Sequence, residues 1–260
     1  MRTGPSADSQ AWQVPQGWRQ GCGAWGGLVI GAMLRAVGAS SHGPLALRSV
    51  SAQICAPVSG SVDLRVQALR EGSSMTMWQA SVHGAEHLAE AVVITGPDRA
   101  VDLDPALTAA LVEQVPAPEV DPAWRDCPVT PVQPPLGPEF ARHFEYRVLQ
   151  GLPLTGGAPR TRGWIRDPRD PHWDAVRVLA IVDAWWPCLY ASLREPRPMA
   201  TVDFAAHLVG DPQGARPGEP LLHDAELIAL HGGYATERRR LWTISGELLV
   251  ESIQSLAIIR

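Results

Sequence analysis

Residues 173–190, WDAVRVLAIVDAWWPCLY, most constrain the fold, because they read as a helix that is apolar on nearly every side. Such a helix is normally buried in a protein core, and this one carries Asp183 with it. The charged form of a buried carboxylate is unfavourable unless its neighbours compensate it. Pro187 has no N–H for the Asp183 carbonyl and is expected to kink or end the helix. Asp183 is therefore either a candidate catalytic acid or base, or a structural aspartate bonded to backbone groups.

Length and composition set the class of protein. The 260 residues fit one large domain or two of ordinary size, and 45% hydrophobic content is ample for a packed core. The net charge of −5 gives no sign of nucleic-acid binding. All 22 basic side chains are arginine and asparagine is absent, which is typical of a GC-rich bacterial genome.

Several kinds of segment and site are not expected. The N-terminus has no apolar region typical of a secretory signal, and no run of about 18 apolar residues predicts a membrane span. The four cysteines lie far apart and form no C-x-x-C motif, which fits a reduced, cytoplasmic protein without disulfides or a zinc site. No metal and no cofactor are predicted.

The pattern along the chain divides it into four parts. Residues 1–20 read as a loose arm, 21–100 as a first repeat, 101–138 as a proline-rich linker and 139–260 as a second repeat. Eight prolines fall between Pro116 and Pro138, and a short helix is predicted over residues 104–114. The first repeat is predicted to hold a buried helix at 25–40, followed by strands at 45–57, 61–70, 74–82 and 89–95.

The second repeat is predicted to follow the same plan. A strand at 140–149 and the buried helix precede strands at 199–208, 225–231, 235–244 and 247–260. Identity between the halves is low, but the order helix, strand, strand, hairpin is shared. This order indicates duplication of a unit of about 100 residues, an ordinary domain size.

Several segments carry a resemblance to a known family: GGLVIGAML after Trp25, LREGSS from Leu69, GWIR from Gly163, VDAWWP around Asp183, MATVDF around Thr201, and GELLVESIQSLAIIR at the end. In this order and spacing the chain resembles the acyl-CoA thioesterase II (TesB-like) enzymes over nearly its whole length. The resemblance implies an α+β double hotdog fold, with two tandem hotdog repeats that each wrap an antiparallel sheet around a long central helix.

The resemblance also implies a catalytic trio in the second repeat: Asp183 as general base, with Thr201 and Gln254 holding the attacking water. The first repeat lacks the trio. The segment pairing places Leu47 opposite Thr201, Val92 or Val93 opposite Gln254, and Val29 opposite Asp183, which implies one active site per chain. The strand around Thr201 is more apolar than is usual in the family.

Further site residues are expected from the chemistry of thioester hydrolysis. Gly26 and Gly27 are candidates for backbone N–H groups that receive an oxyanion at a helix start. Trp185 and Trp186, beside Asp183, are candidates for the acyl pocket. Residues 238–240, three successive arginines, read either as a contact to coenzyme A phosphates or, with better odds, as a solvated strand end.

Three functions are weighed. The first is hydrolysis of an acyl-CoA substrate in bacterial lipid metabolism; the second is non-catalytic binding of acyl groups or acyl-CoA. The third, a hotdog hydratase or dehydratase, ranks low because no histidine sits in a clear hydratase motif. No G-x-S-x-G motif is present, so a serine α/β-hydrolase is not expected. A homo-oligomer is expected by analogy with hotdog proteins alone.

Overall fold

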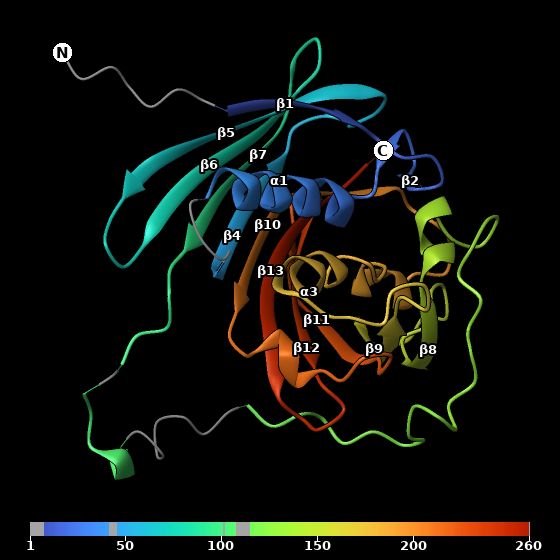
Figure 1. Ribbon diagram of the computed structural model, residues 1–260. Coiled ribbons are helices and arrows are strands. Elements are labelled where there is room, and N and C mark those ends of the chain that lie inside the picture. Colours follow the sequence, from blue (N-terminus) through green and yellow to red (C-terminus); the bar gives the residue numbers. More distant parts are fainter. Residues whose placement is uncertain (1–7, 42–45, 101, 108–114, 260) are drawn as a thin grey trace.

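One continuous antiparallel sheet forms the body of the protein in the computed structural model, which describes residues 8–41, 46–100, 102–107 and 115–259. Eleven strands follow one another in the order β1-β5-β6-β7-β4-β10-β13-β12-β11-β9-β8. The sheet curves around the helices α1 and α3, which lie together on its concave side (Figure 1). This is the double hotdog fold that the resemblance predicted.

The first repeat supplies half of the sheet and the longer helix. Its elements are β1 (Asp8–Gln13), β2 (Arg19–Gln20), β3 (Gly23–Ala24), α1 (Gly26–Ser40), β4 (Leu47–Ile54), β5 (Ser61–Glu71), β6 (Thr76–His83) and β7 (His87–Thr95). Alternating apolar residues on β5 bury one face, so Val62, Leu64 and Val66 pack in the core. The predicted helix and four strands of this repeat are confirmed.

The second repeat repeats this order with short helical turns added. Its elements are η1 (Glu139–His143), β8 (Glu145–Gln150), β9 (Arg160–Arg166), α3 (Ala175–Ile181), η2 (Cys188–Ala191), β10 (Met199–Leu208), η3 (Pro212–Gly214), β11 (Leu221–His231), β12 (Tyr234–Trp242) and β13 (Leu248–Ile258). The strand predicted at 140–149 is part wrong, because its first residues form the short helix η1.

The two repeats join where β4 pairs with β10 at the centre of the sheet. Phe204 lies opposite Ala52, and both side chains are fully buried. On the concave side, α1 packs against α3, with Gly31 close to Ala180 and Val176. Small residues at this crossing let the two helices approach closely.

The helix predicted over 173–190 is much shorter than expected. α3 ends at Ile181, and the chain then forms a tight turn in which the Asp183 N–H donates to the Ala180 carbonyl at 3.1 Å. Distant side chains take up the freed carbonyl groups: Trp25 Nε1 donates to the Asp183 carbonyl, and Arg239 donates to those of two neighbouring residues. The helix therefore stops before Pro187.

The segments outside the repeats also differ from expectation. Residues 8–13 of the predicted loose arm form β1, which pairs with the edge strand β5. Within the predicted linker, Trp124 and Cys127 pack with Trp164 and Trp242 on the outer face of the second repeat. The predicted linker helix is seen at residues 105–107, and its remainder lies outside the described residues. Among the described helices, none is long and apolar enough to cross a membrane.

Candidate active site

Asp183 lies buried in the turn after α3, with 7% of its surface exposed. The turn faces the first residues of α1, and the Gly27 N–H donates to Asp183 Oδ2 at 2.9 Å. The N-terminus of a helix carries unpaired N–H groups and a partial positive charge, so it stabilises a nearby carboxylate. The two repeats therefore meet at Asp183, with the acid on one and the helix start on the other.

Charged groups behind Asp183 set its ionisation. Arg239 Nη1 lies 3.8 Å from Asp183 Oδ1, and Glu237 forms an ion pair with the same guanidinium. Burial has the largest effect and raises the pKa of Asp183 from 3.8 to about 6. The Arg239 charge and the Gly27 hydrogen bond oppose this rise. An acid with a pKa near 6 is ionised at neutral pH and still basic enough to take up a proton.

Gln254 is fully buried on β13, opposite Phe204 of β10 and Glu237 of β12. Its amide is near enough to Asp183 to lower the pKa of that carboxyl, yet neither amide atom has a partner at hydrogen-bond geometry. An amide just beyond hydrogen-bond distance still acts electrostatically on the carboxyl. A buried amide without a protein partner normally bonds to water.

Thr201 lies on the same face of the sheet as Gln254. The register pairs Thr201 with Leu256, which is two residues from Gln254 and so points to the same side. A bulge between Thr201 and Asp203 adds one residue to β10, which keeps Thr201 and Phe204 on one face although they are three apart. Thr201 is half-buried, so all three predicted residues face the interior of the second repeat.

The two glycines at the start of α1 both adjoin the acid. The N–H of Gly27 is engaged by Asp183, so Gly27 contacts the acid instead of offering a free donor to an oxyanion. A Cβ on Gly26 would lie 2.8 Å from Asp183 Oδ2, and one on Gly27 would lie 2.4 Å from the Ala180 carbonyl oxygen. Only glycine fits this close approach of helix and turn.

A cavity of about 370 Å³ lies beside this site, between α1, α3 and β1. Its wall is mainly aromatic and aliphatic, and Gly27 connects it to the acid. Lining side chains include Trp12, Trp18, Trp25, Leu28, Ala32, Leu64, Phe144, Trp173, Val176, Ala180 and Ile181. Its size and apolar wall are within the range of small-molecule sites.

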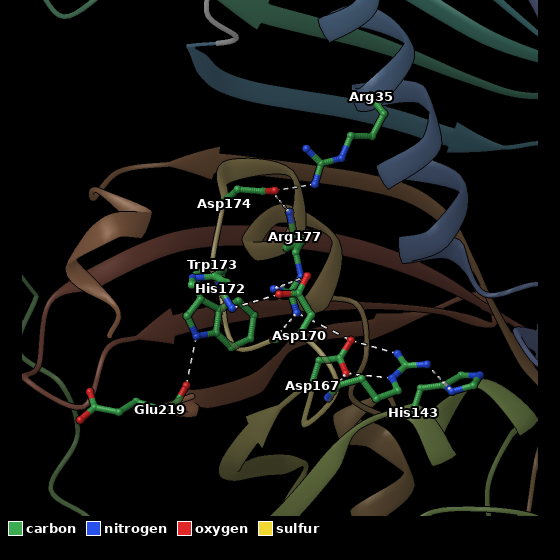
Figure 2. Close-up of polar contacts among 10 residues, drawn as sticks. Arg35, His143, Asp167, Asp170, His172, Trp173, Asp174, Arg177 and Glu219 are labelled. Atoms are coloured by element: carbon green, nitrogen blue, oxygen red, sulfur yellow. Dashed lines mark hydrogen bonds and ion pairs between the residues drawn. The ribbon is translucent and has the colours of Figure 1, made fainter. Parts of the chain in front are cut away.

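Three charged side chains, Arg35, Asp167 and Arg177, also line the cavity. Figure 2 shows their polar contacts. Arg35 of α1 bonds to Asp174, the residue that caps the start of α3, at 2.5 Å. Arg177 Nη1 reaches Asp170 at 3.1 Å. Both arginines thus line the cavity while each pairs with a carboxylate.

Trp185 and Trp186, the candidates for the acyl pocket, are not among the residues that line this cavity. Trp185 is 2% exposed and stacks on His223 with ring centroids 4.7 Å apart, and its ring closes against Gly163. Trp186 Nε1 donates to the Gly151 carbonyl. Their role as acyl-pocket residues therefore stays a prediction.

The segment pairing predicted that the first repeat has no catalytic residue at the positions opposite Asp183, Thr201 and Gln254. Apolar side chains do occupy these positions. Val29, Leu47 and Val93 are all buried in the core.

Sequence reasoning missed Glu237 and Arg239, which are 0% and 1% exposed. All three arginines of residues 238–240 are paired with carboxylates, and the interpretation as a solvated strand end is wrong for the middle one. The alternation along the strand could have predicted that both are buried, because the apolar residues Ala235 and Leu241 share a face with Glu237 and Arg239.

Comparison with known families now places the chain. The profile of the acyl-CoA thioesterase C-terminal domain matches residues 114–258, and that of the N-terminal domain matches residues 14–96. The chain belongs to the acyl-CoA thioesterase family. The two profiles match segments of both repeats, and the turn of Asp183 lies within the match to the C-terminal domain.

Several solved structures share the fold of this chain. A conserved hot dog fold protein of unknown function from Alicyclobacillus acidocaldarius superposes with a TM-score of 0.85 at 21% identity, over 97% of this chain and 93% of that one. Acyl-CoA thioesterase II TesB2 from Mycobacterium marinum gives 0.73 at 18%, over 96% and 93%. A tesB protein from Mycobacterium avium subs paratuberculosis gives 0.71 at 20%, over 100% and 95%. No curated protein sequence matches the chain significantly.

Proposed function

We propose that this protein hydrolyses acyl-CoA thioesters to a free acid and coenzyme A, with Asp183 as the general base that activates water. One observation carries the proposal: a buried carboxylate with a pKa of about 6 lies near a fully buried amide, that of Gln254, which has no protein partner. A water held between these two groups would satisfy the amide and stand beside the base.

The steps follow from these positions. Asp183 takes a proton from the water as the water oxygen attacks the thioester carbonyl carbon. The tetrahedral intermediate then collapses, the carbon–sulfur bond breaks, and the protonated Asp183 returns the proton to the leaving thiolate. Gln254 and Thr201 orient the water, and Gly26 remains a candidate donor to the oxyanion. A positioned general base contributes about 10²–10⁴-fold to the rate.

The cavity beside Gly27 fits the two parts of such a substrate. Its aromatic and aliphatic wall suits the acyl chain, which gains free energy on leaving water. Arg35 and Arg177, which also line it, suit the phosphates of coenzyme A, because guanidinium groups pair well with phosphate oxygens. Both arginines would exchange part of their present contacts to Asp174 and Asp170 for the ligand.

Non-catalytic binding of acyl-CoA is the second candidate function. The same cavity would serve it, but a binding protein has no use for an unsatisfied buried amide beside a buried acid. A hydratase ranks below it, since burial holds the pKa of His223 well below its ordinary value and its ring is stacked on Trp185. Location in the cytoplasm, a role in bacterial lipid metabolism and assembly into a homo-oligomer remain predictions.

The test is thiol release from acyl-CoAs of graded chain length, branching and aromaticity, followed with a thiol-reactive dye. Wild type should turn over at least one of them, and Asp183→Asn should lose about 10²–10⁴-fold in kcat while it still binds the substrate. Asp203→Asn, on the opposite face of β10, is the matched control and should retain activity. A wild type that binds acyl-CoA and releases no thiol would transfer the assignment to the binding function.

A further inference from the structure

Arg239 is the most deeply buried cation in the described structure, and it contacts the turn of Asp183 on both sides. It comes from the concave face of β12, and its side chain is 1% exposed. Arg239 Nη1 donates to the carbonyl groups of Val182 and Trp185, each at 3.1 Å. These carbonyls precede and follow Asp183 along the chain, so one guanidinium holds both ends of the turn.

Glu237 holds that guanidinium in place. Its Oε1 accepts from Arg239 Nε at 2.6 Å, and its Oε2 accepts from the Cys188 N–H at 2.8 Å. The contact to Cys188 fixes the chain just beyond Pro187, where the turn ends. The two side chains therefore connect strand β12 to the full length of the segment that follows α3.

We propose that Arg239, anchored by Glu237, is the positioning residue of this active site: it fixes the turn that presents Asp183 to Gln254 and keeps the carboxylate charged in the core. The inference rests on the proposed function. A simple structural pair would need only the contacts between Glu237 and Arg239. The bonds to both flanking carbonyls and the 3.8 Å approach to Asp183 Oδ1 are the added observations.

The other groups around Asp183 contribute no charge, so Arg239 and Glu237 are the charged side chains that act on its carboxylate. Tyr146 of β8 donates to the Ala184 carbonyl, and burial raises its pKa well above the ordinary value. His223 of β11 has its pKa lowered well below 6.5 by burial, and burial raises the pKa of the Cys188 thiol. Burial therefore favours the neutral form of all three groups. From α1 comes the Gly27 N–H, and from β13 the uncharged amide of Gln254.

Three substitutions separate charge from geometry. Arg239→Gln removes the cation that lowers the pKa of Asp183, so the acid limb of kcat/KM should move to higher pH by about one unit or more. Glu237→Gln removes the anion that raises this pKa, so the limb should move to lower pH. Arg239→Lys keeps the charge but lacks the Nε donor that binds Glu237 while Nη1 binds the two carbonyls, so kcat should fall by about 10²-fold with a limb that moves much less.

The same titration is read without turnover from the ¹³C carboxyl signal of Asp183, identified by its loss in Asp183→Asn. Arg240→Gln is the control, because Arg240 pairs with Glu251 on the opposite face of the same strand; its limb and signal should match wild type. Each readout reports the folded protein and does not depend on how much of a variant folds.

Opposite shifts in Arg239→Gln and Glu237→Gln support the inference. Unchanged limbs and signals in both, with only a lower melting temperature, would reduce the pair to a structural role while leaving the proposed hydrolysis intact. A wild type without thioesterase activity whose carboxyl signal still shifts in opposite directions would overturn the proposed function and keep the charge arrangement.

Discussion

Asp183→Asn should make the protein more stable at neutral pH while it abolishes hydrolysis. With Asp183 ionised, the buried cluster holds two anions and one cation; with asparagine it holds only the matched pair Glu237 and Arg239. Asparagine still offers Gly27 an oxygen acceptor. Active sites often carry such a trade of stability for function.

The magnitude follows from the pKa of Asp183, raised in the fold from 3.8 to about 6. Each pKa unit corresponds to about 1.36 kcal/mol, so the ionised group lowers the free energy of unfolding by about 3 kcal/mol relative to its neutral form. Because the folded pKa is the higher one, the stabilising effect of the neutral carboxyl is complete below about pH 4 and is lost as pH rises through about 6. The unfolded chain carries no comparable penalty.

Urea unfolding at pH 4, 6 and 7.5 measures this difference. At pH 7.5 the variant should exceed wild type by about 2–3 kcal/mol, or roughly 4–10 °C in melting temperature. At pH 4 the two should nearly coincide. Asp203→Asn is the control, because Asp203 accepts from Gln53 on the outer face of the sheet. A variant no more stable than wild type at pH 7.5, or equally stabilised at both extremes, would refute the reasoning.

Three further results are expected. In wild type, kcat/KM for thioester hydrolysis should rise with pH through about 6 as Asp183 ionises, and a profile flat from pH 5 to 8 would contradict a base with this pKa. Gly26→Ala places a Cβ 2.8 Å from Asp183 Oδ2 and should lower kcat by about 10²-fold. Gly157→Ala, whose Cβ would meet Thr155 at an ordinary 3.6 Å and which does not line the cavity, should keep activity; equal activity in both variants would oppose this site. Gln254→Leu removes a buried amide without a partner, so it should lose about 10²-fold in kcat with unchanged or higher stability, and loss of folding instead would mark the amide as structural.

Local patterns were sufficient to predict most strands. The strand predicted at 199–208 coincides with β10, and the helix predicted at 25–40 differs from α1 by one residue. These elements follow the apolar period, because each buries one face against the core.

Contacts between distant parts of the chain account for the errors. α3 ends early where Trp25 and Arg239 bind the carbonyl groups of Asp183 and Val182 just beyond it, and neither side chain is near these residues in sequence. β1 carries little apolar pattern and is ordered by pairing with β5. Arg239 stands within a charged run that locally reads as solvated, and this outweighed the alternation that places it on one strand face with Ala235 and Leu241.

The pairing of β4 with β10 limits how the chain can be cut into separately produced fragments. A C-terminal fragment produced alone would lack β4, the strand that pairs with β10 along residues 203–207. The backbone N–H and C=O groups on that side of β10 would then have no partner strand. The exposed edge of β10 would pair with a strand of another molecule, which leads to self-association or aggregation. Gene fusions and truncations should therefore preserve both halves as a single folding unit, since neither is a self-sufficient module.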